Sequence, residues 1–169
     1  FNSYAVDAIP LNLTQTSVNN LVFGNVEQWQ VMQASDALEI QVERLTNDEI
    51  IKIDSVRMQQ IFTNLLNNAA QAMNHIGIIT IKLRKHSDDT ISLSFSDEGG
   101  GILKEDQPFI FERFYRGENK KFTTRGLGLG LPLSKMMAKS LGGDLQLVQS
   151  SANGTTFELI LPIAVDLHE

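Results

Sequence analysis

Apolar residues recur at steps of three and four between residues 54 and 73, and this stretch organises the chain. The stripe consists of Met58, Phe62, Leu65, Ala69 and Met73. This spacing predicts an amphipathic helix that buries one face, with Asp54 or Ser55 at its N-cap. Residues 14–35 show a similar period and predict an earlier helix, with a weak point at Gly24.

Alternating apolar and polar positions predict strands over 38–43, 49–53, 77–84, 90–96, 144–150 and 155–161. Ser87-Asp-Asp89 separates two of these strands and predicts a hairpin. A third helix is expected to open at Gly126–Leu131, with Pro132 in its first turn and Gly142-Gly143 at its C-cap. The order of elements predicts an α+β fold: a two-layer α/β sandwich with a mixed, mostly antiparallel sheet covered on one face by three helices.

The polar side of the 54–73 helix carries amides where charges are usual. These residues are Gln60, Asn64, Asn67, Asn68 and Gln71. Asn costs about 0.5–0.7 kcal/mol relative to Ala in a helix, so an ordinary surface favours Glu or Lys. Asn64 and Asn68 are one turn apart on the same side, and an amide oxygen can bind Mg²⁺ without adding negative charge beside a triphosphate. Taken alone, the segment is equally compatible with a solvated, Asn-rich helix.

Composition limits the class of protein. The chain has 169 residues, 42% of them hydrophobic and 20% charged, as expected for one globular domain. Its net charge of −6 argues against a sequence-independent nucleic-acid binder. The sequence has no Cys, which excludes disulfides and thiolate metal sites and fits a reducing compartment. It contains no apolar run of the roughly 20 residues that span a membrane. Residue 1 is Phe, which fits a piece of a longer protein.

Two glycine clusters suggest a nucleotide site. Asp97-x-Gly99-x-Gly101 ends a strand, where glycines permit close ligand approach and an acceptor-only carboxylate suits the adenine amine. Such strings are more often simple turns. Gly126-x-Gly128-x-Gly130 opens a helix, where backbone N–H groups and the helix dipole favour phosphate. Neither a dinucleotide fold nor a phosphate loop fits, because the cluster comes late in the chain and no Gly-Lys-Ser/Thr follows.

The polar stretch 103–125 is typical of a lid or binding loop. It contains a group of cations: Arg113, Arg116, Lys120, Lys121 and Arg125. On an acidic chain these favour phosphate neutralisation over a merely solvated charge run. Its aromatic residues, Phe109, Phe111, Phe114 and Tyr115, are best interpreted as a small satellite hydrophobic cluster.

Several segments resemble the boxes of one family, in the same order. Asn64–Ala69 resembles the N box, Asp97–Ile102 the first glycine box, Phe111–Arg116 the F box and Gly126–Leu131 the second glycine box. The closing strand is matched by Gly154-Thr-Thr-Phe157 and Leu161-Pro162. Residues 11–163 thus resemble the catalytic ATP-binding (HATPase_c) domain of two-component sensor histidine kinases in the GHKL superfamily. The resemblance makes residues 1–10 a linker from a preceding helical hairpin and 164–169 a C-terminal tail.

The resemblance implies ATP and Mg²⁺ as cofactors. Asn68 would bind the metal, Asn64 would lie near the phosphates, Arg116 would reach the γ-phosphate, and Asp97 would bind the adenine amine with Thr156 helping through water. The implied nucleotide contacts are Asn64, Asn68, Gln71, Asp97, Gly99, Gly101, Ile102, Phe111, Arg116, Gly126, Leu127, Gly128, Leu129, Gly130, Leu131 and Thr156, with Asn64, Asn68 and Arg116 as the catalytic residues. Gln71 replaces a frequent Lys or Arg, and Leu127 replaces a frequent Thr or Ser.

None of His75, His86 and His168 lies in the context of the family's phosphoacceptor. The resemblance therefore implies an isolated, monomeric kinase domain that donates the γ-phosphoryl group to a His on the dimerising hairpin of the same parent protein, for relay to a response-regulator Asp. We expect a cytoplasmic location, even if the parent is anchored in a membrane, and no nucleic-acid partner.

Two other functions compete with this prediction. The first is a GHKL ATPase, but the hydrolases of the superfamily carry a Glu general base where this chain has Asn64, and Asn cannot accept that proton. The second is an anti-sigma-factor-type kinase or nucleotide-gated binding module. The F box favours the sensor kinases, while the missing hairpin leaves this second alternative open.

Overall fold

The computed structural model describes residues 10–112 and 130–164. Its elements, in order, are β1 (Leu13–Ser17), α2 (Val18–Val31), β2 (Leu38–Glu43), β3 (Ile50–Asp54), α3 (Ser55–Ala72), β4 (Gly77–Ser87), β5 (Thr90–Asp97), the short 3₁₀ helix η1 (Gln107–Phe109), α5 (Gly130–Ser140), β6 (Asp144–Ser151) and β7 (Gly154–Pro162).

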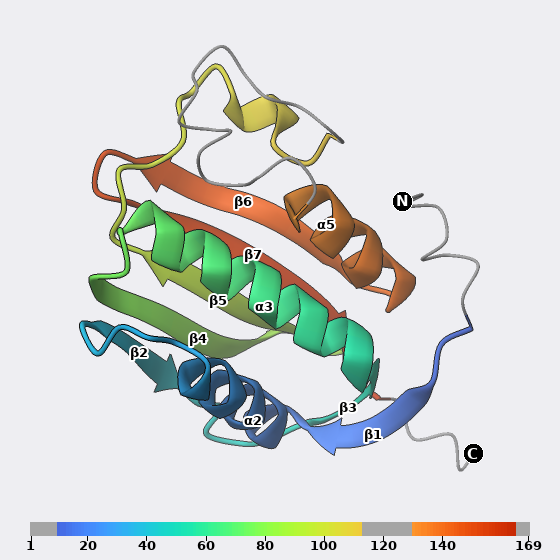
Figure 1. The fold of residues 1–169 in the computed structure, drawn as a ribbon. Helices are drawn as coiled ribbons and strands as arrows, with labels where there is room; N and C mark the ends of the chain where they lie inside the picture. Colours follow the sequence, from blue (N-terminus) through green and yellow to red (C-terminus); the bar gives the residue numbers. More distant parts are fainter. Residues whose placement is uncertain (1–9, 113–129, 165–169) are drawn as a thin grey trace, which may run out of the picture.

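The main sheet has five strands in the order β2-β4-β5-β7-β6, and α2, α3 and α5 lie on one of its faces (Figure 1). Strands β2 and β4 pair in parallel, while the β4–β5, β5–β7 and β6–β7 pairs are antiparallel. The core lies between the two layers. This arrangement confirms the predicted two-layer sandwich and its mixed, mostly antiparallel sheet.

Helix α3 runs across the middle of the sheet (Figure 1) and confirms the predicted amphipathic segment. The apolar stripe is buried, and Phe62 meets Phe95 of β5 edge to face, with ring centres 5.2 Å apart. Asp54 caps the helix, because its side chain accepts the Val56 and Arg57 backbone N–H groups.

The start of the first predicted helix is wrong. Residues 13–17 form β1, which pairs antiparallel with β3, and α2 begins only at Val18. Thr14 and Thr16 are β-branched and suit a strand, while the Ser17 hydroxyl accepts the Asn20 backbone N–H at 3.1 Å and caps the helix. The helix then passes through Gly24 without interruption and ends at Val31, before the predicted residue 35.

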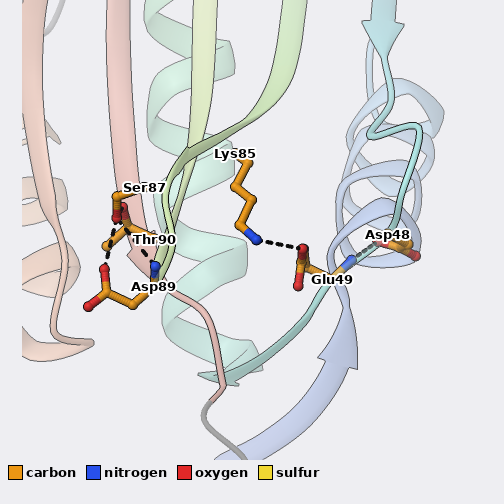
Figure 2. Close-up of polar contacts among 6 residues, drawn as sticks. All are labelled: Asp48, Glu49, Lys85, Ser87, Asp89 and Thr90. Atoms are coloured by element: carbon orange, nitrogen blue, oxygen red, sulfur yellow. Dashed lines mark hydrogen bonds and ion pairs between the residues drawn. The ribbon is translucent and has the colours of Figure 1, made fainter.

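Polar contacts close the end of the β4–β5 hairpin that is remote from Asp97 (Figure 2). The Ser87 hydroxyl donates to the Asp89 carboxylate at 2.8 Å and lies 2.6 Å from the Thr90 hydroxyl. Lys85 reaches Glu49 of the β2–β3 connection at 3.6 Å. The predicted hairpin is confirmed.

The predicted end of the third helix is also confirmed. Pro132 lies in the first turn of α5, and the Gly142 and Gly143 backbone N–H groups bond back to the Lys139 and Ala138 carbonyls. No helix in the described part of the chain is long and apolar enough to cross a membrane.

Candidate functional site

Asn64 joins α3 to the first turns of α5. Its side-chain Nδ2 donates to the Gly130 carbonyl at 3.3 Å and to the Ser134 hydroxyl at 3.0 Å. The two segments are 66 residues apart in sequence. The structure therefore brings the predicted N box and the last glycine of the second glycine box together, as the nucleotide-site prediction requires.

Asn68 lies one turn further along α3 and is only 5% exposed. Its Oδ1 atom is buried and has no hydrogen-bond partner within residues 10–112 and 130–164. An unsatisfied buried acceptor costs about 1–3 kcal/mol, so such an atom calls for an explanation. Amide oxygens are ligands that Mg²⁺ accepts, so Asn68 fits the metal-binding role. The same ranges contain no cluster of three or more His, Cys, Asp or Glu side chains suited to a metal.

The first glycine box lies against the end of α3. Asp97 is 8% exposed at the end of β5, and its Oδ1 accepts the Gly99 backbone N–H at 2.8 Å. A Cβ on Gly99 would come within 2.7 Å of the Ala72 carbonyl oxygen of α3. Only Gly therefore allows the Asp97 loop to approach the helix that carries the two Asn residues.

Gly101 and Ile102 hold the same loop against β6. Gly101 has a φ of +87°, and a Cβ there would lie 2.1 Å from the Ser151 carbonyl oxygen. The Ile102 backbone N–H donates to the Ser150 hydroxyl at 2.8 Å. The first glycine box, which starts at Asp97, is thus fixed between α3 and β6.

Thr155 and Thr156 lie on opposite faces of β7. Thr155 is 1% exposed and shares the helix-covered face with Phe157, and it is the register partner of Asp97. Thr156 is on the other face, where its hydroxyl lies 2.7 Å from that of Ser96. The structure does not bring Thr156 to Asp97; the neighbouring threonine occupies that place. The water-mediated contact assigned to Thr156 stays a prediction, with Thr155 as the better-placed residue.

Phe111 packs onto the core at the edge of the site. Its ring meets Phe157 edge to face at 6.2 Å, and the Lys135 ammonium lies 4.6 Å from its centre. Lys135 also donates to the Leu145 carbonyl at 2.8 Å and pairs with Asp144 at 3.1 Å. The prediction that the Phe111 ring belongs to a hydrophobic cluster fits this packing.

Asp144 completes that group of contacts. Burial alone would raise the pKa of Asp144, but the Leu145 backbone N–H and the hydrogen bond and charge of Lys135 outweigh it. The pKa of Asp144 therefore lies below its usual value. The ionised carboxylate holds Lys135 in place over Phe111.

The other predicted site residues fall into two groups. Gly130 begins α5, Leu131 is buried, and Gln71 is exposed on α3. Arg116, Gly126, Leu127, Gly128 and Leu129 lie outside the described residues, as do the other predicted cations of 113–125.

Sequence reasoning missed Thr155, Ser150 and Ser134. Apolar residues alternate along β7 at Phe157, Leu159 and Leu161, and this pattern places Thr155 on the same face of the sheet. The position of Thr155 could therefore be predicted from the sequence. Ser134 carried no comparable signal, because its partner Asn64 is 70 residues away. Ser150 carried none either, because its contacts with Ile102 and Thr155 depend on the shift of register in β6.

An amide-bearing helix, an acidic glycine loop and a second helix that meets the first at Asn64 define a nucleotide-binding domain of the two-layer kinase and ATPase class. Residues 53–165 match the family described as "Histidine kinase-, DNA gyrase B-, and HSP90-like ATPase". The chain belongs to this family, and the predicted catalytic ATP-binding domain of the sensor-histidine-kinase type is confirmed.

Similar proteins agree with this assignment. The sensor-like histidine kinase SenX3 of Mycobacterium tuberculosis is 27% identical over 158 residues, covering 93% of this chain and 38% of SenX3. The signal transduction histidine-protein kinase AtoS of Escherichia coli is 34% identical over 155 residues, covering 88% of this chain and 24% of AtoS. The chain therefore spans well under half the length of either relative.

Among solved structures, full-length ShkA in complex with AMPPNP is similar in fold. Its TM-score is 0.74 at 22% identity, and the match covers 98% of this chain and 35% of ShkA. At this identity the likeness establishes the fold.

Proposed function

We propose that this chain binds Mg²⁺–ATP and transfers the γ-phosphoryl group to a His on a separate, dimerising helical domain of the same parent protein. The observation that carries the proposal is the pair of amides on α3. Asn68 has a buried oxygen free for a metal within the described residues, while Asn64 directs its amide to α5. An amide cannot act as the general base that hydrolysis needs, so transfer is favoured over ATP hydrolysis.

The chain's own residues would bind and orient the nucleotide. Asp97 would accept a hydrogen bond from the adenine amine, because an ionised carboxylate only accepts. Thr155 would supply a hydroxyl beside it on the same face. The first turn of α5, opened by Gly130, would face the phosphates with its backbone N–H groups.

Asn68 would hold Mg²⁺, which supplies charge neutralisation on the phosphate oxygens when bound. By resemblance we further assign phosphate contacts to Arg116, Gln71 and the 126–131 glycines and leucines, and Phe111 to the edge of the nucleotide pocket. Phosphoryl transfer depends mainly on positioning and charge, so what this chain would still need is an aligned nucleophile.

That nucleophile defines the partners. We assign the acceptor His to the hairpin domain of the parent protein, and the onward acceptor to an Asp of a response regulator. A kinase of this type would act in the cytoplasm and as a monomeric unit when separated from its hairpin. SenX3 and AtoS are named as histidine kinases, which supports the assignment.

Incubation with γ-labelled ATP and Mg²⁺ tests the proposal. The chain alone should release phosphate slowly and should not label itself. Addition of the parent's hairpin domain should place an acid-labile label on that domain's His. Rapid phosphate release by the chain alone would favour the ATPase, and a stable acid-labile label on the chain itself would contradict the proposed division of labour.

A further inference from the structure

A bulge in β6 decides which side chain faces Thr155. The β6–β7 register shifts between Leu147 and Gln149: Leu147 pairs with Phe157, Gln149 with Thr156 and Ser150 with Thr155. An unbroken register would have placed Gln149 opposite Thr155. The extra residue, Val148, is 55% exposed. Bulges commonly re-aim side chains next to functional sites, and here the bulge replaces a long amide with a short hydroxyl.

The Ser150 hydroxyl makes two hydrogen bonds that span the loop and the sheet. It accepts the Ile102 backbone N–H at 2.8 Å and lies 2.7 Å from the Thr155 hydroxyl. A Ser hydroxyl has one proton and two lone pairs. After it accepts from Ile102, its own proton can be donated to Thr155, which then directs its proton away from Ser150.

The two groups held by Ser150 belong to the strand that pairs with Asp97 and to the loop that follows Asp97. Thr155 is the register partner of Asp97 on the helix-covered face. Ile102 ends the glycine loop that begins at Asp97, and Gly101 of that loop would place a Cβ 2.1 Å from the Ser151 carbonyl oxygen. The loop therefore touches β6 at Ser150 and Ser151, and the Ser150 hydroxyl connects the loop to Thr155.

We propose that Ser150 is a positioning residue for nucleobase recognition. Its hydroxyl fixes the glycine loop through the Ile102 amide and sets the direction of the Thr155 hydroxyl beside Asp97. The inference rests on the proposed function, since it takes Asp97 as the residue that binds the adenine amine. Ser150 acts through Ile102 and Thr155 and touches no ligand itself.

Calorimetric titration of the full 169-residue chain with Mg²⁺–ATP and Mg²⁺–GTP tests the inference. Ser150→Ala should lower ATP affinity about three- to tenfold, the loss expected for a hydrogen bond. GTP affinity should stay unchanged, because its six-position carbonyl gains nothing from the Asp97 carboxylate. The ratio of ATP to GTP affinity therefore falls. Ser151→Ala is the matched control: its hydroxyl accepts only the Asn153 N–H in the described contacts, and the ratio should be unaffected.

If Ser150 acts only in general packing, both affinities should fall equally and their ratio should stay unchanged. That result would overturn the inference. Wild-type affinities in Ser150→Ala would also overturn it. Ser150→Cys keeps the shape of the side chain, with a slightly larger sulfur atom and a weak hydrogen-bonding group, so it decides the question if the Ala variant unfolds. A wild-type chain that binds no ATP contradicts the proposed function itself. Wild-type ATP binding with an unchanged ratio in both Ser150 variants contradicts the inference alone.

Discussion

Thr155 of β7 and Asp97 of β5 are register partners whose side chains lie on the same, helix-covered face of the sheet. Thr156 points to the other face, towards Ser96. The pair of adjacent threonines therefore provides a direct comparison, because the two side chains are chemically identical and only their faces differ.

Replacing each threonine by Val should show which face of β7 contributes to ATP binding. Thr155→Val removes a hydroxyl beside Asp97 and should weaken ATP binding about three- to tenfold. Thr156→Val should leave ATP affinity within about twofold of wild type, since only the Ser96 contact is lost. Equilibrium binding of a fluorescent ATP analogue measures both. A larger loss of ATP affinity in Thr156→Val than in Thr155→Val would show that Thr156 is the residue beside the base.

Asp97→Asn tests recognition of the base. Asn keeps an oxygen for the Gly99 N–H but presents an NH₂ group where an acceptor is needed. ATP affinity should fall by about 1.5–3 kcal/mol, the scale of a hydrogen bond to a charged group. Calorimetry of wild type and variant with ATP and GTP measures the change. Equal affinity of the wild type for ATP and GTP would contradict the adenine assignment.

Asn68→Ala should raise stability and abolish function. Ala adds no volume and removes an acceptor that is buried without a partner among the described residues. The free energy of unfolding should rise by about 1–2 kcal/mol, while the Mg²⁺ dependence of ATP binding is lost. Urea denaturation and titrations with and without Mg²⁺ give the two quantities. A less stable variant that still needs Mg²⁺ would show that Asn68 is a structural residue.

Asn64→Asp should loosen the contact between α3 and α5. The variant loses the donor to Gly130 and Ser134 and places a carboxylate beside the Gly130 carbonyl. We expect a loss of about 1–3 kcal/mol in the free energy of unfolding, measured by urea denaturation. Asn67→Asp is the control, because it keeps the oxygen that accepts the Trp29 Nε1–H at 2.9 Å. Equal losses in both variants would mean that any new charge on α3 is harmful.

Asp54 should make stability depend on pH. Burial alone would raise the pKa of Asp54, but the backbone N–H groups of Asn12, Arg57 and Val56 and the Arg57 charge lower it below its usual value. A carboxylate with a depressed pKa stabilises the fold above its unfolded pKa of about 3.9, and this contribution is lost as the pH falls through the folded pKa.

Asp54→Ala should therefore cost about 1–2 kcal/mol at neutral pH, as expected for loss of an N-cap. The difference from wild type should shrink as the pH falls below about 4. Urea denaturation over a pH series measures it, with the exposed turn residue Asp88→Ala as the control. A difference that does not change with pH would exclude the carboxylate charge as its cause.

Much of the fold followed from periodicity. The stripe from Met58 to Met73 specified α3, and the alternating segments specified the five strands of the main sheet, because burial of one face imposes these periods directly. Strand β1 was missed since Leu13–Ser17 is short and its partner β3 lies more than 30 residues away. A strand stabilised mainly by a distant pairing leaves little local signal.

The candidate site shows the same contrast between local sequence signals and contacts with distant residues. Asn64, Asn68, Asp97 and the glycines are recognisable from residue type and spacing. The structure joins Asn64 to Gly130 and packs Gly99 against Ala72 of the same helix. The resemblance implies Thr156, whereas the alternation of buried residues along β7 puts Thr155 on the helix-covered face. The bulge at Val148, which brings Ser150 to Thr155, has no counterpart in the sequence pattern.

The pairing of β1 with β3 also matters for anyone who joins this domain to a different sensor. The family match starts at residue 53, near the end of β3. Yet β3 is paired along its length with residues 13–17, and the Asn12 backbone N–H donates to the Asp54 carboxylate at 3.0 Å. A fusion junction placed at the family boundary would strip the partner strand from β3 and one donor from the α3 cap. In a functional chimera the junction should therefore lie upstream of Asn12, so that the β1–β3 pair stays intact in the fused domain.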